Sequence, residues 1–263
     1  MGEGVKIAAY FLAALTFLTA CSNPKDQLKV AATAVPHAEL LEFVKPDLME
    51  KGINLQIIVV EDYNIPNRAL AEKEVDANFF QHIPFLEQQI AQFHYPIESL
   101  AKIEIEPMGL YSKKIKNISE LKEGSKIAIP NDPTNEARAL ALLDKYGIIK
   151  LDNPKNLRAT VLNIASNPKK LKFEEIDASM LSRTLPDVDA AVINANFALQ
   201  ANLNPMTDAL LREGPDSPYA NIIAIRIADV ERQDLKELKA AMTSEKMRDY
   251  ILTKYKGAIQ PAF

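Results

Sequence analysis

The sequence has little of several residue types on which common protein chemistries depend. Its 263 residues include one cysteine and eight glycines, and no tryptophan. The single cysteine, Cys21, excludes an intramolecular disulfide and a metal site built from cysteines. The glycines form neither a G-x-G-x-x-G loop nor a G-x-x-x-x-G-K-S/T loop, which argues against a nucleotide site. His37, His82 and His94 lie far apart and match no zinc motif, so we expect no metal site and no cofactor.

The chain also lacks a surplus of basic residues. Its formal charge is −4 and its pI is near 5.6, which leaves no electrostatic footprint for a nucleic acid. Hydrophobic residues make up 48% and charged residues 25% of the chain, which is ordinary for a globular protein. At roughly 150 residues per domain, the length fits one large domain or two smaller lobes.

The amino-terminal segment is typical of an exported, lipid-anchored protein. Residues 7–17 form an uncharged apolar run of signal-peptide length, well short of the roughly 20 residues that cross a bilayer. Leu18-Thr-Ala-Cys21 resembles the Leu-x-Ala/Gly-Cys lipobox of bacterial lipoprotein precursors. We therefore expect a signal peptide over 1–20, and an acylated Cys21 followed by a tether over 21–27. The mature protein would be anchored to the cell membrane and would face the periplasm or the cell exterior.

The remaining chain alternates between strand-like and helix-like segments, which predicts an α/β fold of two lobes with a cleft between them. Lobe 1 is expected over 28–112 and 203–263, and lobe 2 over 113–202. The predicted strands cover residues 28–33, 53–60, 75–80, 101–113, 125–130, 159–164, 188–193 and 219–227. The predicted helices cover residues 36–49, 68–73, 84–93, 117–124, 134–146, 178–185 and 235–254. Residues 53–60 are mostly apolar, which predicts burial on both faces of that strand.

Five segments, in order along the chain, resemble the MetQ/NlpA family of methionine-binding lipoproteins. They are DYNIPN (62–67), VDANFFQH (75–82), IPNDPTNEARAL (129–140), DAAVINANFA (189–198) and SPYAN (217–221). The resemblance implies a periplasmic-binding-protein-like fold and a non-enzymatic role. It also implies methionine or a close analogue as the ligand, with the permease and ATPase subunits of an ABC importer as partners.

A methionine-like ligand presents a carboxylate, an ammonium group and a flexible thioether tail. Thr134 is a plausible N-cap, which places Asn135 and Arg138 in the first turns of one helix and on the same face. A helix N-terminus with an arginine makes an anion site, so we expect Asn135 and Arg138 to bind the carboxylate. The alternative for Arg138 is a solvated charge on the helix surface.

Aromatic side chains are the expected walls for the thioether tail. Tyr63, Phe80 and His82 gather near the ends of two predicted strands, where ligands bind in open α/β sheets. Successive strand residues face opposite ways, so at most one of Phe79 and Phe80 should line the cleft, and Phe80 shares the face of His82. The alternatives are ordinary core for the phenylalanines and a structural role for His82.

Asparagines are expected to bind the polar head of the ligand. Asn196 and Asn221 lie at strand ends or turns, and a buried amide there is costly unless it is paired. Both rank above Asn194, and turn capping is the alternative for all three. Glu136 and backbone carbonyls are candidates for holding the ammonium group.

The remaining acidic pairs carry no expected role. Glu104 and Glu106, like Glu174 and Glu175, sit in charged stretches and are expected to form solvated faces. Two other functions stay open beside the binding protein: a surface-anchored enzyme on the same two-lobed scaffold, and a lipid-anchored sensor or adhesin.

Overall fold

The computed structural model describes residues 27–214 and 217–263. The predicted signal peptide and Cys21 lie outside these residues. Within the described ranges, no helix combines the length and the apolar character needed to cross a bilayer.

Lobe 1 is built on a six-stranded sheet with the order β13-β4-β12-β3-β1-β2. β1 is parallel to β2 and β3, whereas β12 is antiparallel to β3 and β4. The strands are β1 (Gln27–Thr33), β2 (Asn54–Val60), β3 (Ala77–His82), β4 (Ile97–Ile105), β12 (Ala220–Arg226) and β13 (Gln260–Pro261). One buried cluster joins the sheet to α1 (Glu39–Glu50), α7 (Gln233–Met242) and α8 (Glu245–Tyr255). A second joins the other face to α2 (Pro66–Ala71) and α3 (Ile83–Phe93).

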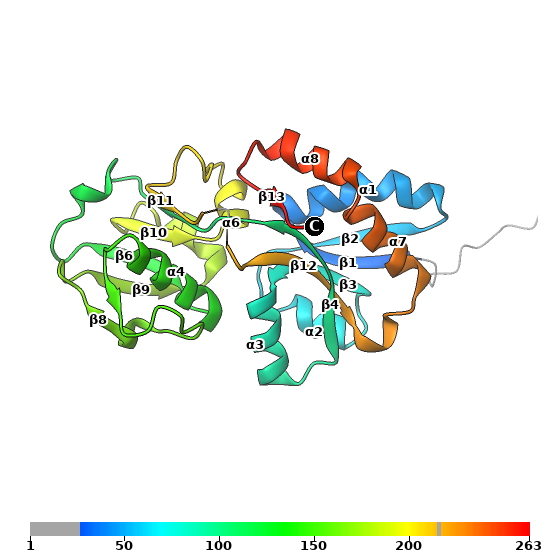
Figure 1. Cartoon of the computed structure of the whole chain (residues 1–263), viewed down its shortest axis with the longest axis horizontal. Helices are drawn as coiled ribbons and strands as arrows, with labels where there is room; N and C mark the ends of the chain where they lie inside the picture. Colours follow the sequence, from blue (N-terminus) through cyan, green and yellow to red (C-terminus); the bar gives the residue numbers. More distant parts are fainter. Residues whose placement is uncertain (1–26, 215–216) are drawn as a thin grey trace, which may run out of the picture.

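Lobe 2 is built on a five-stranded sheet with the order β11-β5-β10-β6-β9, and it lies to the left of lobe 1 in Figure 1. Its strands are β5 (Gly109–Tyr111), β6 (Lys126–Pro130), β9 (Lys172–Ile176), β10 (Ala190–Ile193) and β11 (Leu211–Arg212). α4 (Pro133–Lys145) covers one face, and α5 (Leu181–Thr184) with α6 (Ala195–Gln200) covers the other. A small ribbon of β7 (Lys150–Leu151) and β8 (Ile164–Ser166) completes the lobe.

The chain passes between the sheets after β4 and returns before β12 (Figure 1). β5 and β11 pair with each other and belong to the sheet of lobe 2. Residues 109–111 and 211–212 were assigned to lobe 1 from the sequence. The strand pairing therefore moves the crossing points from 112/113 and 202/203 to positions before Gly109 and after Arg212.

Most predicted helices and strands form at the expected places, and Gly52, at φ +78°, turns the chain just after α1. Residues 159–164 are an exception, because Val161–Asn163 forms a 3-10 turn capped by Thr160 instead of a strand. The predicted single helix over 235–254 is two helices, since Ser244 accepts from the Met247 N–H and starts α8 there.

The expected burial of β2 on both faces is wrong. β2 pairs with β1 alone at the edge of the sheet, and most of its residues are partly or fully exposed. Val59 is 52% exposed. An apolar run therefore did not distinguish an edge strand from a central one here.

Candidate functional site

The predicted binding residues lie on segments from both lobes. Lobe 1 supplies Tyr63 from the loop after β2, Phe80 and His82 from the end of β3, and Asn221 from β12. Lobe 2 supplies Asn135 and Arg138 from the first turns of α4, and Asn196 from the first turn of α6. Tyr63 is half-buried, and the other six are buried.

Tyr63 is the main aromatic contact between the lobes. Its hydroxyl donates to Asn196 Oδ1 at 2.6 Å. Its ring lies 5.0 Å from the ring of Phe197 in lobe 2, and 5.8 Å from that of Phe80 in lobe 1. Burial raises the pKa of Tyr63 well above its ordinary value, so the hydroxyl keeps its proton and donates.

His82 makes the second contact across the cleft. Its Nδ1 accepts from the Phe85 N–H at 3.1 Å, so the neutral ring carries its proton on Nε2 and donates to Asn135 Oδ1, also at 3.1 Å. Burial, and then the charge of Arg138, lower the pKa of His82 to about 3. Asn135 Oδ1 also accepts from Asn194 Nδ2 at 2.8 Å.

Asp132, and not Thr134, caps α4. The Asp132 carboxylate accepts from the Asn135 backbone N–H at 3.0 Å and from the Asn135 side chain. The carboxylate is the better acceptor for the free N–H groups of the first turn, because it also complements the helix dipole. The Thr134 hydroxyl instead donates to Asp132.

These contacts enclose a small cavity between the lobes. Its water-accessible space is about 10 Å³, roughly that of one water molecule. Its walls combine aromatic rings with amides and one imidazole: Tyr63, Phe80, Gln81, His82, Phe85, Asn135 and Asn194. Phe79 packs in the core of lobe 1, so the choice of Phe80 over Phe79 as the lining residue agrees with the structure. Gln81, Phe85 and Asn194 are additional lining residues.

Arg138 does not line this cavity. Its side chain is nevertheless buried, with 4% exposed, so it is not a solvated charge on the helix surface. Its Nε and Nη2 donate to the two carboxylate oxygens of Glu213 at 2.8 and 2.5 Å, and Nη2 also donates to the Glu106 carbonyl at 2.7 Å. Its guanidinium lies 4.3 Å from the ring centre of Tyr219, whose other neighbour is His82 at 5.0 Å. Burial opposes the charged form, but the charge and hydrogen bonds of Glu213, together with Tyr219 and Glu106, outweigh it and raise the pKa of Arg138.

Two amides beside the cavity keep unpaired atoms. Asn194 Oδ1 and Asn196 Nδ2 are buried and have no hydrogen-bond partner among the described residues. Buried amide atoms usually find partners, so an unpaired acceptor and an unpaired donor mark a place where a zwitterionic ligand could bind.

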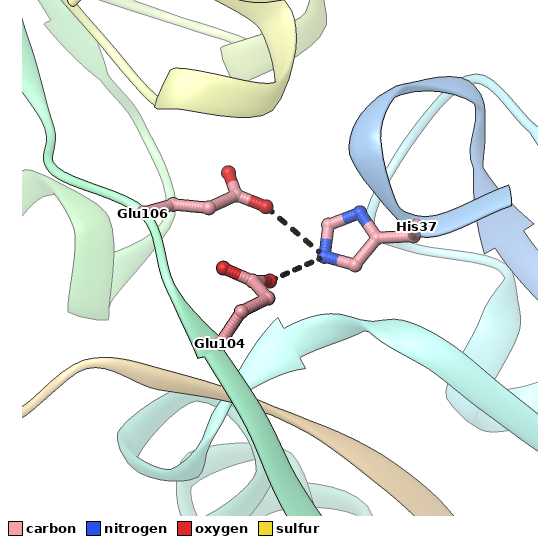
Figure 2. A group of neighbouring side chains, drawn as sticks. All are labelled: His37, Glu104 and Glu106. Carbon is pink, nitrogen blue, oxygen red and sulfur yellow. Dashed lines mark ion pairs between the residues drawn. The ribbon is translucent and has the colours of Figure 1, made fainter. Parts of the chain in front are cut away.

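The expectation of a solvated face for Glu104 and Glu106 is wrong. Both side chains are buried, and Figure 2 shows them directed at the imidazole of His37. His37 Nε2 lies 3.4 Å from Glu104 Oε1 and 3.2 Å from Glu106 Oε1. Burial raises the pKa of both carboxyl groups well above the ordinary value and lowers that of His37. Asn221 connects this group to the cleft, because it is paired in register with Glu104 on β4 and with His82 on β3.

The other candidate acids do not reach the cleft cavity. Glu136 Oε1 accepts from the Val161 N–H at 3.0 Å, and Glu174 forms a surface ion pair with Lys126 at 2.9 Å. Neither lines the cavity. Glu213 was not among the expected site residues, and it lies 75 residues from Arg138 along the chain.

Two sheets flanked by helices, with buried polar side chains meeting between them, define a two-lobed α/β protein of the periplasmic-binding type. The model of the NlpA lipoprotein family matches residues 28–263, and the chain belongs to that family. The family and the fold class predicted from the sequence are thereby confirmed.

Named relatives agree with this assignment. The chain is 38% identical to the methionine-binding lipoprotein MetQ of Bacillus subtilis over 99% of this chain and 97% of that protein. It is 40% identical to the D-methionine-binding lipoprotein MetQ of Salmonella typhi over 84% of this chain and 83% of that protein. It also resembles the structure of a nutrient binding protein from Burkholderia cenocepacia bound to methionine. That likeness has a TM-score of 0.87 and 45% identity, over 90% of this chain and 100% of the other.

Proposed function

We propose that this chain is a membrane-anchored lipoprotein that captures methionine, or a close analogue, between its lobes and delivers it to the permease and ATPase of an ABC importer. The observation that carries the proposal is the cleft itself. Aromatic rings and amides from both lobes close on one cavity, and two of the amides keep unpaired atoms. The methionine-binding relatives point to the same ligand class.

The thioether tail would lie among Tyr63, Phe80 and His82. Sulfur–aromatic contacts contribute about 0.3–1.5 kcal/mol each, which favours methionine over an aliphatic side chain of similar size. The unpaired atoms of Asn194 and Asn196, with the neighbouring amide of Asn221, would bind the polar head.

Arg138 would attract the ligand carboxylate from the end of α4. Its Nε and Nη2 are committed to Glu213 and Glu106, whereas its Nη1 makes no hydrogen bond to the described residues. Tyr219 lies between Arg138 and His82, so a modest movement of that ring would join the arginine to the cavity.

Ligand exchange requires the lobes to separate, because the cavity has room for about one water molecule. Tyr63–Asn196 and His82–Asn135 are contacts of the closed state. A ligand that binds both lobes has a higher affinity for this state and shifts the population toward it. The importer would then receive the closed, loaded protein.

The described cavity lining contains no serine, threonine or cysteine beside a base, so it offers no support to the enzyme alternative. The sensor or adhesin alternative predicts no tight ligand. Calorimetry with methionine, on protein unfolded and refolded to remove co-purified ligand, decides between that alternative and a binding protein.

The same calorimetry tests the site. Arg138→Ala is expected to weaken methionine binding by roughly 30-fold or more, because a desolvated carboxylate loses a charged partner. Arg158→Ala, an exposed arginine of the same lobe, is the control and should bind as the unmodified protein does. Unchanged affinity in folded Arg138→Ala protein would remove the arginine from the site. Absence of methionine binding to the unmodified protein would overturn the function.

The anchor has a separate test. Cys21→Ser should abolish incorporation of labelled fatty acid and move the protein from the detergent phase to the aqueous phase. Labelling that persists in this variant would contradict the lipobox interpretation.

A further inference from the structure

A second group of buried polar side chains, outside the walls of the cleft cavity, has a chemistry of its own. We call His37, Glu104 and Glu106 the acidic triad. His37 lies in the turn Ala34–Ala38 after β1, in which Val35 has an extended backbone. Glu104 is near the end of β4, and Glu106 follows two residues later, where the chain leaves for lobe 2 (Figure 2).

The triad buries two acidic groups without a cation to balance them. The side chains of His37, Glu104 and Glu106 are 1%, 0% and 5% exposed. No lysine or arginine among the described residues forms an ion pair with either glutamate, and Arg138 is committed to Glu213. Two buried carboxylates without a counter-charge cost several kcal/mol each, unless a proton or a bound cation neutralises them.

The atoms that face one another in the triad form no hydrogen bond of good geometry with the described residues. They are His37 Nε2, both carboxylate oxygens of Glu104, and Glu106 Oε1, and all are buried. The side chains of Asn221 and Glu106 do approach the Glu104 carboxylate. The other imidazole nitrogen is held, because His37 Nδ1 lies 2.6 Å from Thr33 Oγ1. If Nδ1 donates to Thr33, the lone pair of Nε2 points at the two carboxylates. A hydrogen bond from the nitrogen that does not bind the metal commonly orients a metal-binding histidine.

The spacing of these atoms discriminates between kinds of cation. Ligands about 2.0–2.1 Å from a tetrahedral metal ion lie about 3.3 Å from one another. Three acceptors around an ammonium group, each about 2.8 Å from its nitrogen, lie about 4.5 Å apart. The observed separations from His37 Nε2 are 3.2 and 3.4 Å, and all three ligand atoms lie within 4.8 Å of one another. Two of the three edges therefore have the dimension of a metal coordination shell.

We propose that His37 Nε2, Glu104 and Glu106 bind one divalent transition-metal ion of the zinc type. One imidazole and two carboxylates form a ligand set that suits zinc better than magnesium or calcium, which prefer oxygen ligands alone. A charge of +2 neutralises both glutamates. The ion would join the turn after β1 to the first crossing between the lobes. The proposal does not depend on methionine as the ligand of the cleft.

The test measures metal on the full-length protein, purified in detergent and stripped with a chelator. Equilibrium dialysis against buffered zinc, followed by elemental analysis, should give about one zinc per chain, and zinc should raise the melting temperature. Glu104→Gln and Glu106→Gln should each lower zinc affinity by about 100-fold or more. Thr33→Val, which removes only the partner of Nδ1, should lower it by roughly tenfold. Glu98→Gln changes the same charge on the same strand without touching the triad, and should bind zinc as the unmodified protein does.

The outcomes separate the proposal from its rivals. Glutamine variants that melt cooperatively without metal but no longer bind zinc support the proposal. If a glutamine variant fails to fold, the expected loss of zinc affinity in Thr33→Val supports the proposal in its place. Zinc that binds equally well to the double glutamine variant would lie elsewhere and would overturn it. If the unmodified protein binds no zinc, the proposal is also overturned. A loss of methionine affinity in Glu106→Gln would in that case assign the glutamates to the ammonium group of the ligand.

Discussion

Two groups of buried polar side chains in lobe 1 differ in whether their hydrogen-bonding atoms have partners. The amide network of Asn67, Asn78 and Gln81 links α2 to β3. Asn67 Oδ1 accepts from Asn78 at 2.9 Å and from Gln81 at 2.7 Å, while Asn67 Nδ2 donates to Gln81 at 2.8 Å. Gln81 also donates to Asn78 at 2.9 Å. The acidic triad, formed by the turn after β1 and the carboxyl end of β4, has four unpaired atoms instead.

The comparison shows that burial of polar groups does not by itself indicate a binding role. The amide network is complete without any other molecule, so its role is to fix α2 on the sheet. The acidic triad and the unpaired amides of the cleft are incomplete, and completion there needs a group from outside the described chain. Substitutions should therefore act on stability at the first group and on binding at the other two.

The largest expected effect is on stability, at the amide network. Asn67→Ala removes the acceptor of two buried donors and the donor to Gln81. Each buried group left unpaired costs about 1–3 kcal/mol, so the free energy of unfolding in urea should fall by about 3 kcal/mol or more. Glu106→Gln, measured in chelator, should unfold at the same or a higher urea concentration, because the glutamine amide needs neither a proton nor a cation to be neutral in the buried site. The distinction between the two groups fails if Glu106→Gln is destabilised as much as Asn67→Ala.

An intermediate effect on stability is expected when the pH is lowered, because of His82. Both of its ring nitrogens have hydrogen-bond partners, as the amides of the network do, but the imidazole can take up a proton. Its folded-state pKa of about 3 lies below the ordinary value of 6.5, so the unfolded chain binds the proton first as the pH falls. Stability is therefore complete above pH 6.5 and is lost as the pH falls toward 3. Between pH 7.5 and pH 5.0 the loss from this group should be about 2 kcal/mol, since each pH unit below 6.5 contributes about 1.4 kcal/mol.

Comparison with His82→Gln isolates this contribution. Glu104 and Glu106 have raised pKa values and stabilise the fold as the pH falls, which is the opposite sign, and they are present in both proteins. Urea unfolding at the two pH values, in chelator and with methionine present to keep the lobes closed, gives the difference. If the variant and the unmodified protein lose the same stability between pH 7.5 and pH 5.0, His82 is not the neutral, buried group that its contacts indicate.

The features that depend on short stretches of sequence, namely the helices, the strands and the family motifs, were predicted well. The alternation of strands and helices, and the five motif segments, were sufficient for the fold class and the family. Tyr63, Phe80, His82 and Asn135 lie together as expected, because each is at, or a few residues after, the carboxyl end of a strand that faces the cleft. Their roles in binding methionine remain predictions.

The sequence could not show which residues far apart along the chain come into contact in the fold. Glu104 and Glu106 alternate with apolar residues in KIEIEP, a pattern typical of a strand with one solvated face. In the fold, β4 lies between β12 and β13, and His37 approaches the two glutamates from 67 and 69 residues earlier. A usable sign was the position of the pair directly before Pro107, because proline interrupts the pairing of a strand. Glu213 offered no comparable sign.

The smallest expected effect is at the cleft, where Tyr63→Phe removes one hydroxyl and keeps the ring. In the proposed closing motion this hydroxyl bonds to Asn196 Oδ1 in the closed state alone, so its loss should weaken that state by about 1 kcal/mol. Methionine affinity should then fall by roughly fivefold in calorimetry, while the urea midpoint of the ligand-free protein changes little if that protein is mainly open. Small-angle scattering should still show compaction at saturating methionine. A variant that binds as tightly as the unmodified protein would show that this contact does not favour closure. A variant that is strongly destabilised without ligand would place Tyr63 with the amide network, as a structural residue.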